Sequence, residues 1–126
     1  MPDGNRRFAE ENQISLSESY YLGGKTLKLF SEFFVVESKA KRLIYYATSY
    51  YTDGRIDGSL EVIYEAAKKT FEELLKERFF INNGIRFIVA DSSKNLPSEL
   101  KKVATDLSDS TKKLNNGEVI VLFGYS

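Results

Sequence analysis

The chain has 126 residues, of which 42% are hydrophobic and 29% charged, and its 18 Lys and Arg residues balance 18 Asp and Glu residues. This is the composition of an ordinary globular protein, and the zero net charge argues against nucleic acid as a partner. The absence of cysteine and histidine excludes disulfides, thiolate nucleophiles, cysteine-based zinc sites and histidine bases. Any metal site must use oxygen ligands, which favours Mg²⁺, Ca²⁺ or Mn²⁺.

The length predicts a single domain over residues 1–126 with one sizeable core. No apolar run approaches the roughly 20 residues that span a bilayer. Polar residues follow Met1 directly, so no signal peptide is expected. We therefore expect a cytoplasmic protein with at most peripheral membrane contact.

The opening stretch combines a carboxylate, a turn and two guanidinium groups in the order Asp3-Gly4-Asn5-Arg6-Arg7. Gly and Asn tolerate the positive φ of a tight turn. If a helix begins at the arginines, its free N–H groups face the same space, and the set suits a Mg-bound phosphate. The alternative is a surface turn with two solvated arginines, which spacing alone favours.

Residues 10–19 are mostly polar and predict a short helix end followed by a loop. Gly23 and Gly24 lead into a predicted helix that runs to about Ser38, with apolar residues at helical spacing, namely Leu27, Phe30, Phe33 and Phe34. Val35 and Val36 make the end of this helix apolar all round, which predicts that it is buried or lies against another apolar surface.

Residues 42–51 are rich in aromatic and β-branched residues and predict a strand. Because residues 43–46 contain no polar break, we expect this strand to be covered on both faces, as in a parallel sheet. Residues 52–58 contain two glycines and predict a loop.

The clearest predicted helix runs from Ser59 to about Ile81, and its apolar stripe consists of Leu60, Ile63, Ala67, Phe71, Leu74 and Leu75. Asn82-Asn83-Gly84 is a stop signal. The segment 85–90 predicts a second strand that ends at Asp91.

Pro97 opens a third predicted helix, which ends at residues 115–117 and buries Leu100, Val103, Leu107 and Leu114. Residues 118–123 predict a third strand. The alternation of helices and strands predicts an α/β fold with a parallel sheet, flanking helices and right-handed crossovers. Ligands in such sheets bind beyond the carboxyl ends of the strands, here after Tyr51, Ala90 and Phe123.

Several motifs resemble those of the cis-prenyltransferases, the undecaprenyl diphosphate synthase family. Residues 3–9 (DGNRRFA) resemble the opening signature of the family, and residues 44–55 resemble a strand signature with matches at Tyr46, Ala47, Ser49 and Arg55. Residues 83–91, 96–100 and 115–125 resemble scaffold motifs. The resemblance covers nearly all of this chain, but only about the N-terminal half of a typical member, and so implies a truncated version of that fold.

The chain departs from the family pattern at several positions. A Gly-His-Lys-x-Gly motif falls on residues 19–23, where Tyr20 and Tyr21 replace His and Lys and only Gly23 survives. Thr52 replaces an Asn. The first strand of the family is missing before Asp3, as is the C-terminal half with its isopentenyl diphosphate site and a metal-binding Glu.

The resemblance implies a set of site residues. Asp3 and Asn5 would be catalytic, with Asp3 also the Mg²⁺ ligand. The diphosphate would be bound by Gly4, Arg6, Arg7, Ser49 and Arg55. The prenyl chain would lie against Phe30, Phe33, Phe34, Ile63, Ala67 and Phe71. The alternative for these apolar residues is simple core or an exposed partner surface.

Three hypotheses follow. The first is a diverged cis-prenyltransferase-like protein that binds an allylic polyprenyl diphosphate with Mg²⁺ and is not fully active as a lone chain. Full turnover would require a second chain that supplies the missing half. The implied reaction is Mg-assisted loss of diphosphate with attack by isopentenyl diphosphate.

The second is a non-catalytic interaction subunit that homodimerises or partners a complete prenyltransferase. The third is a truncated product with no selected role. The expected partners are thus an isoprenyl diphosphate and a like or unlike protein chain.

Overall fold

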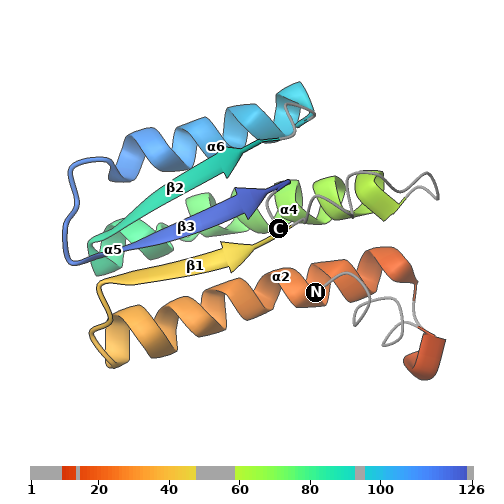
Figure 1. Ribbon diagram of the computed structural model, residues 1–126, viewed down its shortest axis with the longest axis horizontal. Helices are drawn as coiled ribbons and strands as arrows, with labels where there is room; N and C mark the ends of the chain where they lie inside the picture. Colours follow the sequence, from red (N-terminus) through yellow and green to blue (C-terminus); the bar gives the residue numbers. More distant parts are fainter. Residues whose placement is uncertain (1–9, 14, 48–58, 93–95, 125–126) are drawn as a thin grey trace.

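A three-stranded parallel sheet forms the centre of the molecule (Figure 1). The computed structural model describes residues 10–13, 15–47, 59–92 and 96–124. The elements in chain order are α2 (Leu16–Phe30), the π-helix η1 (Ser31–Glu37), β1 (Arg42–Tyr46), α4 (Ser59–Lys76), α5 (Phe79–Asn83), β2 (Ile85–Asp91), α6 (Ser98–Thr111) and β3 (Gly117–Phe123). The predicted α/β fold with a parallel sheet flanked by helices is confirmed.

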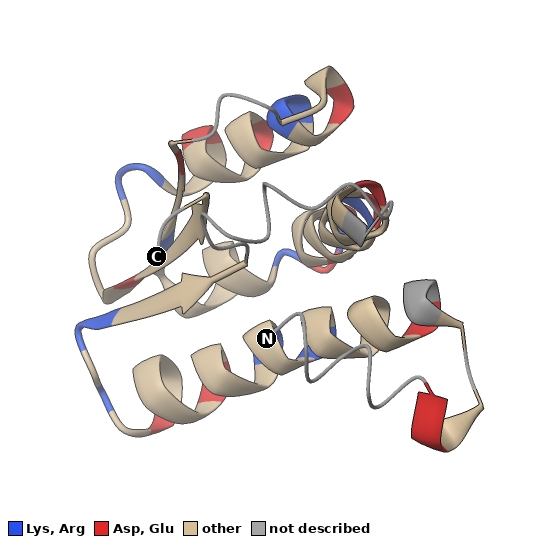
Figure 2. Cartoon of the chain, turned by 45° about the vertical axis from the view of Figure 1, so that its right-hand side comes forward, with Lys and Arg blue, Asp and Glu red and all other residues tan. Residues whose placement is uncertain are grey.

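The last strand in the sequence, β3, lies in the middle of the sheet in the order β1-β3-β2. Val119 of β3 pairs with Leu43 on one side and Phe87 on the other. These side chains belong to the face that α2, α4 and α6 cover (Figures 1 and 2). The largest fully buried side chains include Phe71, Phe80, Phe87, Phe123, Leu100 and Leu107.

The opposite face of β1 is not covered by a described helix. Burial alternates along the strand, and Ile44 and Tyr46 are 48% and 51% exposed. The prediction that β1 is covered on both faces is therefore wrong. The prediction rested on the apolar or aromatic character of every residue from 43 to 46. In the structure, the described long helices all pack on the face of the sheet opposite Ile44 and Tyr46.

Helix α2 begins earlier than predicted. It starts at Leu16, where the Ser15 side chain accepts a hydrogen bond from the Glu18 N–H at 3.0 Å, and Gly23 and Gly24 lie inside it. Gly24 is placed inside the helix by tertiary packing. A Cβ at this position would lie 2.2 Å from Thr70 Oγ1 of α4, so the absence of a side chain permits the two helices to pack closely. The helical path continues through η1 to Glu37, close to the predicted end.

The helix predicted over 59–81 is divided in two. Helix α4 ends at Lys76, Arg78 adopts a left-handed conformation with φ of 56°, and α5 follows. The chain stops being helical at Asn83, and Gly84 has φ of 69°, which confirms the predicted stop signal. The break at Arg78 was not predicted, because arginine carries no turn signal.

Helix α6 begins directly after Pro97 as predicted but ends at Thr111, before residues 115–117. The Thr111 hydroxyl donates to the Leu107 carbonyl and accepts from the Phe87 N–H, both at 2.9 Å. This bond fixes the end of α6 to the outer edge of β2. The predicted buried residues Leu100, Val103 and Leu107 are buried, whereas Leu114 is half-buried beyond the helix.

Candidate functional site

An apolar cavity of about 50 Å³ lies between α2, α4 and the sheet. It is lined from α2 by Tyr20, Gly23, Gly24 and Leu27, from the sheet and its margin by Tyr45, Ala47, Val121 and Phe123, and from α4 by Ile63, Ala66, Ala67, Thr70 and Phe71. Two of these residues, Ala47 and Phe123, lie at the carboxyl ends of β1 and β3. Ligands of parallel α/β sheets bind near this end.

Two of the four residues that line the cavity from α2 are the glycines Gly23 and Gly24. Gly24 passes so close to Thr70 that any side chain at position 24 would collide with it. Gly24 therefore allows α2 and α4 to pack close together beside the cavity.

The hydroxyl groups around the cavity are uncharged. Tyr45 donates a hydrogen bond to the Gly23 carbonyl at 3.1 Å, and burial raises the pKa of Tyr45 to about 12. Thr70 Oγ1 is buried and has no hydrogen-bond partner within the described part of the chain. A buried hydroxyl without a partner costs on the order of 1–3 kcal/mol. With neutral hydroxyls and otherwise apolar walls, the cavity suits a hydrocarbon group and disfavours a charged one.

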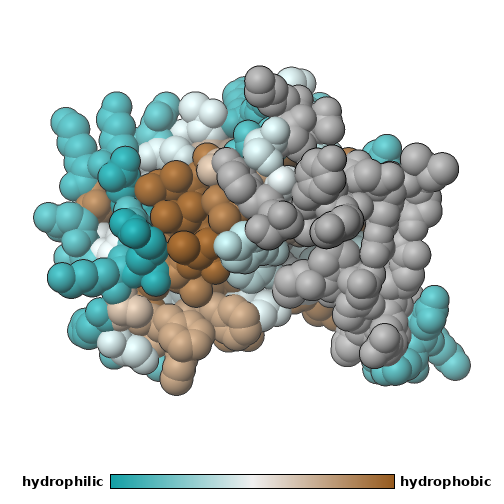
Figure 3. Space-filling model, in the orientation of Figure 1, coloured by the Kyte–Doolittle hydropathy of each residue, from teal (hydrophilic) through white to brown (hydrophobic). Residues whose placement is uncertain are grey.

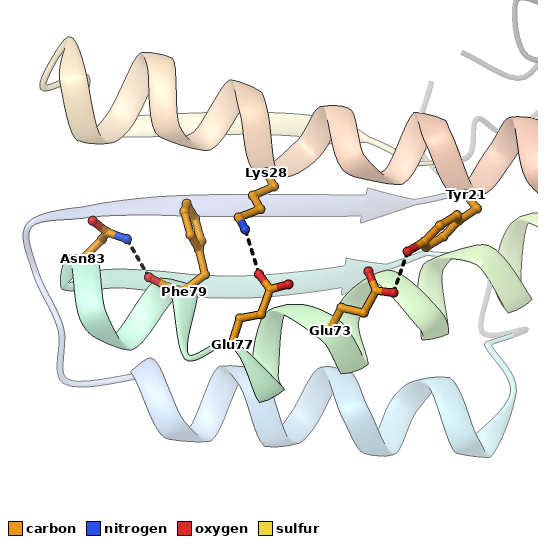
Figure 4. Close-up of polar contacts among 6 residues, drawn as sticks. All are labelled: Tyr21, Lys28, Glu73, Glu77, Phe79 and Asn83. Atoms are coloured by element: carbon orange, nitrogen blue, oxygen red, sulfur yellow. Dashed lines mark hydrogen bonds and ion pairs between the residues drawn. The ribbon is translucent and has the colours of Figure 1, made fainter.

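Polar side chains outside the cavity lining hold α2 to α4 (Figure 4). Tyr21 donates to Glu73 Oε1 at 2.5 Å, and Lys28 Nζ lies 2.7 Å from Glu77 Oε2. The hydrogen bond to Glu73 raises the pKa of Tyr21, and the one to Glu77 raises the pKa of Lys28. The Lys28 ammonium also lies 5.5 Å from the centre of the Phe79 ring.

The structure brings together half of the residues predicted to bind a prenyl chain. Ile63, Ala67 and Phe71 line the cavity on the α4 side. The other three, Phe30, Phe33 and Phe34, are 42%, 55% and 41% exposed and are not among the lining residues.

The predicted catalytic and diphosphate-binding residues all fall outside the described residues. They are Asp3, Gly4, Asn5, Arg6, Arg7, Ser49 and Arg55, and Asp3 is also the predicted Mg²⁺ ligand. Over residues 10–13, 15–47, 59–92 and 96–124, no group of three or more acidic side chains is arranged to hold a metal ion. Within the same ranges, no helix is long and apolar enough to cross a membrane.

Ten of the thirteen lining residues were not singled out as site residues from the sequence, among them Tyr20, Gly24, Tyr45 and Thr70. Tyr20, at the position where the family has His, is only 7% exposed. A predicted helix that included Gly23 and Gly24 would have placed Tyr20, Gly24 and Leu27 on one face, because they are spaced at i, i+4 and i+7. The predicted helix instead began after the glycines, which left Tyr20 outside the apolar stripe.

The fold and the cavity define an α/β protein with an apolar pocket enclosed between two helices and a parallel sheet. A family model described as "Putative undecaprenyl diphosphate synthase" matches residues 1–126, and the chain belongs to this family. The resemblance to cis-prenyltransferases is thereby confirmed.

Two similar curated proteins are undecaprenyl diphosphate synthases of archaea. The chain is 26% identical over 125 residues to the tritrans,polycis-undecaprenyl-diphosphate synthase (GGDP specific) of Sulfolobus acidocaldarius, and 29% identical over 126 residues to the geranylgeranyl-diphosphate specific enzyme of Sulfurisphaera tokodaii. Each alignment covers 99% of this chain and 48% of the relative. The chain thus spans about half the length of the curated relatives it matches.

Solved structures with a similar fold include lavandulyl diphosphate synthase from Lavandula x intermedia, in complex with dimethylallyl diphosphate. The TM-score is 0.84 at 16% identity, over 97% of this chain and 51% of that one. A probable undecaprenyl diphosphate synthase from Campylobacter jejuni matches with a TM-score of 0.67 at 19% identity, over 79% of this chain and 48% of that one. At these identities the likeness establishes the fold.

Proposed function

We propose that the chain is a diverged cis-prenyltransferase-like protein that binds an allylic prenyl diphosphate, with the hydrocarbon tail in the cavity between α2 and α4. The observation that carries this proposal is the apolar lining by Ile63, Ala67 and Phe71, in a chain that belongs to the undecaprenyl diphosphate synthase family. The named relatives act on prenyl diphosphates, which supports the same class of ligand here.

The size of the cavity limits what it can take. One water needs about 10–15 Å³ of such space, so a cavity of about 50 Å³ has room for a few carbon-sized groups. The chain in this conformation accepts part of an allylic tail. A longer tail requires α2 and α4 to separate, which the bonds of Tyr21 to Glu73 and of Lys28 to Glu77 oppose.

We assign the diphosphate end of the ligand to residues outside the described part of the chain. Ala47 lines the cavity, and the sequence continues from it to Ser49 and Arg55. These two residues, with Gly4, Arg6 and Arg7, would hold the diphosphate oxygens, and Asp3 and Asn5 would be the catalytic pair. Guanidinium groups suit this task because they donate two parallel hydrogen bonds.

Asp3 is the residue that would hold Mg²⁺. The described residues offer no acidic cluster, and Mg²⁺ is commonly held by one or two carboxylates together with substrate phosphates and water. When bound, the ion would neutralise the diphosphate and ease its departure. The residues of the chain would bind the diphosphate, orient the tail in the cavity and exclude water from it.

The test is a calorimetric titration of the purified chain with farnesyl diphosphate, with and without Mg²⁺. We expect Mg-dependent binding that Asp3→Ala abolishes. Ala67→Phe fills the cavity and should weaken binding at least tenfold, because the tail loses its place. Glu72→Phe adds the same ring on the exposed side of α4 and is the matched control. Unchanged binding in both Asp3→Ala and Ala67→Phe would overturn the proposal.

A second candidate function is a non-catalytic interaction subunit, which forms homodimers or partners a complete prenyltransferase. The observation that favours it is the exposure of Phe30, Phe33 and Phe34 on one side of α2 and η1. Phe33→Asp separates the two candidates. It should break assembly and leave binding of farnesyl diphosphate intact if these rings contact a partner chain.

A further inference from the structure

A polar groove of about 710 Å³ lies at the amino ends of the three strands. Its walls are the link from η1 to β1, the starts of β1 and β2, and the loop that leads from α6 into β3. Figure 3 shows hydrophilic side chains gathered at this end of the molecule. Because β3 is seven residues long, the groove lies about 20 Å from the carboxyl ends of the strands. The segments 48–58, 93–95 and 125–126 continue the chain from those carboxyl ends.

The charges in this groove are unbalanced. Four of its side chains are cationic, namely Lys39, Lys41, Arg42 and Arg86, and one is acidic, Glu118. The carboxylate of Glu118 forms an ion pair with Arg42. Within the described part of the chain, Lys39, Lys41 and Arg86 have no acidic partner. The groove therefore concentrates positive charge in a chain whose net charge is zero.

The register of the sheet sets the positions of the two arginines. Arg42 of β1 and Arg86 of β2 both lie opposite Glu118 of the central strand. The three side chains thus form one row on the same face of the sheet. Since the carboxylate in the middle of the row is paired with Arg42, the guanidinium group of Arg86 keeps its hydrogen-bond donors for a ligand.

Main-chain hydrogen bonds hold the walls of the groove together. The Asn116 N–H donates to the Gly84 carbonyl at 2.9 Å, which joins the loop before β3 to the start of β2. The Glu118 N–H donates to the Lys41 carbonyl at 2.9 Å, which joins β3 to the start of β1. These bonds preorganise the groove, and preorganisation lowers the cost of binding a ligand.

Lys39 has a backbone conformation that ordinarily favours glycine. Its φ is 60°, and the Ala40 N–H donates to the Phe34 carbonyl at 2.7 Å, which closes the end of η1. The helix dipole favours a cation near this end. The dipole does not account for Lys41, directly before β1, or for Arg86 within β2. A ligand that all three cations share accounts for the whole set.

We propose that this groove binds a phosphate-bearing anion through Lys39, Lys41 and Arg86. Ammonium groups attract phosphate as point charges, and a guanidinium group donates two parallel hydrogen bonds to its oxygens. The phosphate belongs to a free anion or to the head group of an anionic lipid, and the test separates these two sources. The inference does not depend on prenyl binding, because the groove shares no lining residue with the apolar cavity.

The first test is a titration of the isotope-labelled chain with inorganic diphosphate, followed by NMR. We expect saturable shifts of the amide signals of Lys41, Asn116 and Gly117 in the groove. The signals of Ala47 and Gly124, near the carboxyl ends of the strands, report binding at the proposed prenyl diphosphate site separately. Shifts confined to Ala47 and Gly124 would therefore contradict this inference and leave the proposed function standing.

A double variant tests the cations. Lys41→Gln combined with Arg86→Gln should weaken binding in the groove about tenfold or more, because two charge-assisted contacts are lost. Lys101→Gln combined with Lys102→Gln removes two exposed charges from α6 and is the matched control, with an expected change below about twofold. Equal effects of the two double variants would show that the groove has no specific role.

A further variant leaves the fold secure. Lys39→Gly removes one charge at a position where glycine suits the φ of 60°. We expect an unfolding temperature at least equal to that of the wild type, together with weaker diphosphate binding. Wild-type affinity in Lys39→Gly would contradict the assignment of Lys39.

Cosedimentation with phosphatidylcholine vesicles, with and without phosphatidylglycerol, identifies the source of the phosphate. Vesicle binding that requires phosphatidylglycerol and is lost in the double variant of Lys41 and Arg86 assigns a lipid head group. Diphosphate shifts in the groove without vesicle binding assign a free anion. The absence of both would overturn the inference, as would binding that the double variant leaves unchanged.

Discussion

At Gly24 the backbone of α2 lies directly against Thr70 of α4, and this single contact sets the separation of the two helices that enclose the cavity. Glycine inside a helix costs about 1 kcal/mol relative to alanine. The chain retains the glycine where the neighbouring helix leaves no space for a methyl group. A local preference is therefore overridden by packing between residues that are far apart in the sequence.

Gly24→Ala should accordingly destabilise the fold by about 1–3 kcal/mol, despite the better helix propensity of alanine. The clash is with the side chain of Thr70, so the double variant Gly24→Ala, Thr70→Ala should recover much of the loss. Denaturant unfolding of the two single variants and the double variant measures this coupling. Additive effects would show that the contact does not set the helix separation.

Tyr45 provides a prediction on pH. Burial raises its pKa from 10.0 to about 12, so the folded state holds the phenolic proton more tightly than the unfolded state. Its contribution to stability is complete below pH 10 and is lost as the pH rises towards 12, by about 2–3 kcal/mol. Tyr45→Phe should lower stability at neutral pH, through the lost hydrogen bond to Gly23, and flatten the decline above pH 10. A parallel decline in both proteins would contradict the assignment.

At the scale of the elements, apolar burial holds α4 to the sheet more strongly than polar contacts hold it to α2. Phe71 is 2% exposed, and its ring centre lies 5.2 Å from that of Phe87 and 6.4 Å from that of Phe123. The Lys28–Glu77 pair, by contrast, has side chains 38% and 49% exposed. Solvent screens such a pair, which leaves it worth about 0–1 kcal/mol.

Phe71→Ala should therefore lower the free energy of unfolding by about 3–5 kcal/mol, because it empties a large buried volume. Glu77→Gln should cost less than about 1 kcal/mol. Urea unfolding at neutral pH compares the two variants directly. A larger loss in Glu77→Gln than in Phe71→Ala would mean that the ion pair, and not the core, holds α4 in place.

At the scale of the whole molecule, the described helices gather on one face of the sheet and leave β1 open along its edge and on its other face. Parallel sheets are usually covered on both faces. The chain also spans only about half the length of its curated relatives. The exposed residues of α2, η1 and β1 are thus an apolar surface that the described helices leave open.

The order of helices and strands could be predicted because it depends on signals within a few residues: the apolar stripe of α4, the stop at Gly84 and the start at Pro97. The same holds for the part of the cavity that α4 supplies, since Ile63, Ala67 and Phe71 recur at helical spacing. The contribution of α2 was missed because the predicted helix began after Gly23 and Gly24, whereas in the structure Gly24 lies inside the helix and packs against Thr70.

The sequence by itself determined the elements, the parallel α/β class and the family motifs, because hydrophobic periodicity and capping act between neighbours along the chain. Only the tertiary structure decided that β3 lies between β1 and β2, that Tyr20 and Tyr45 meet around a cavity, and that Ile44 remains exposed. These features depend on which distant surfaces pack together. The apolar run of β1 is compatible with either a buried or an open strand, and the placement of the helices selects between them.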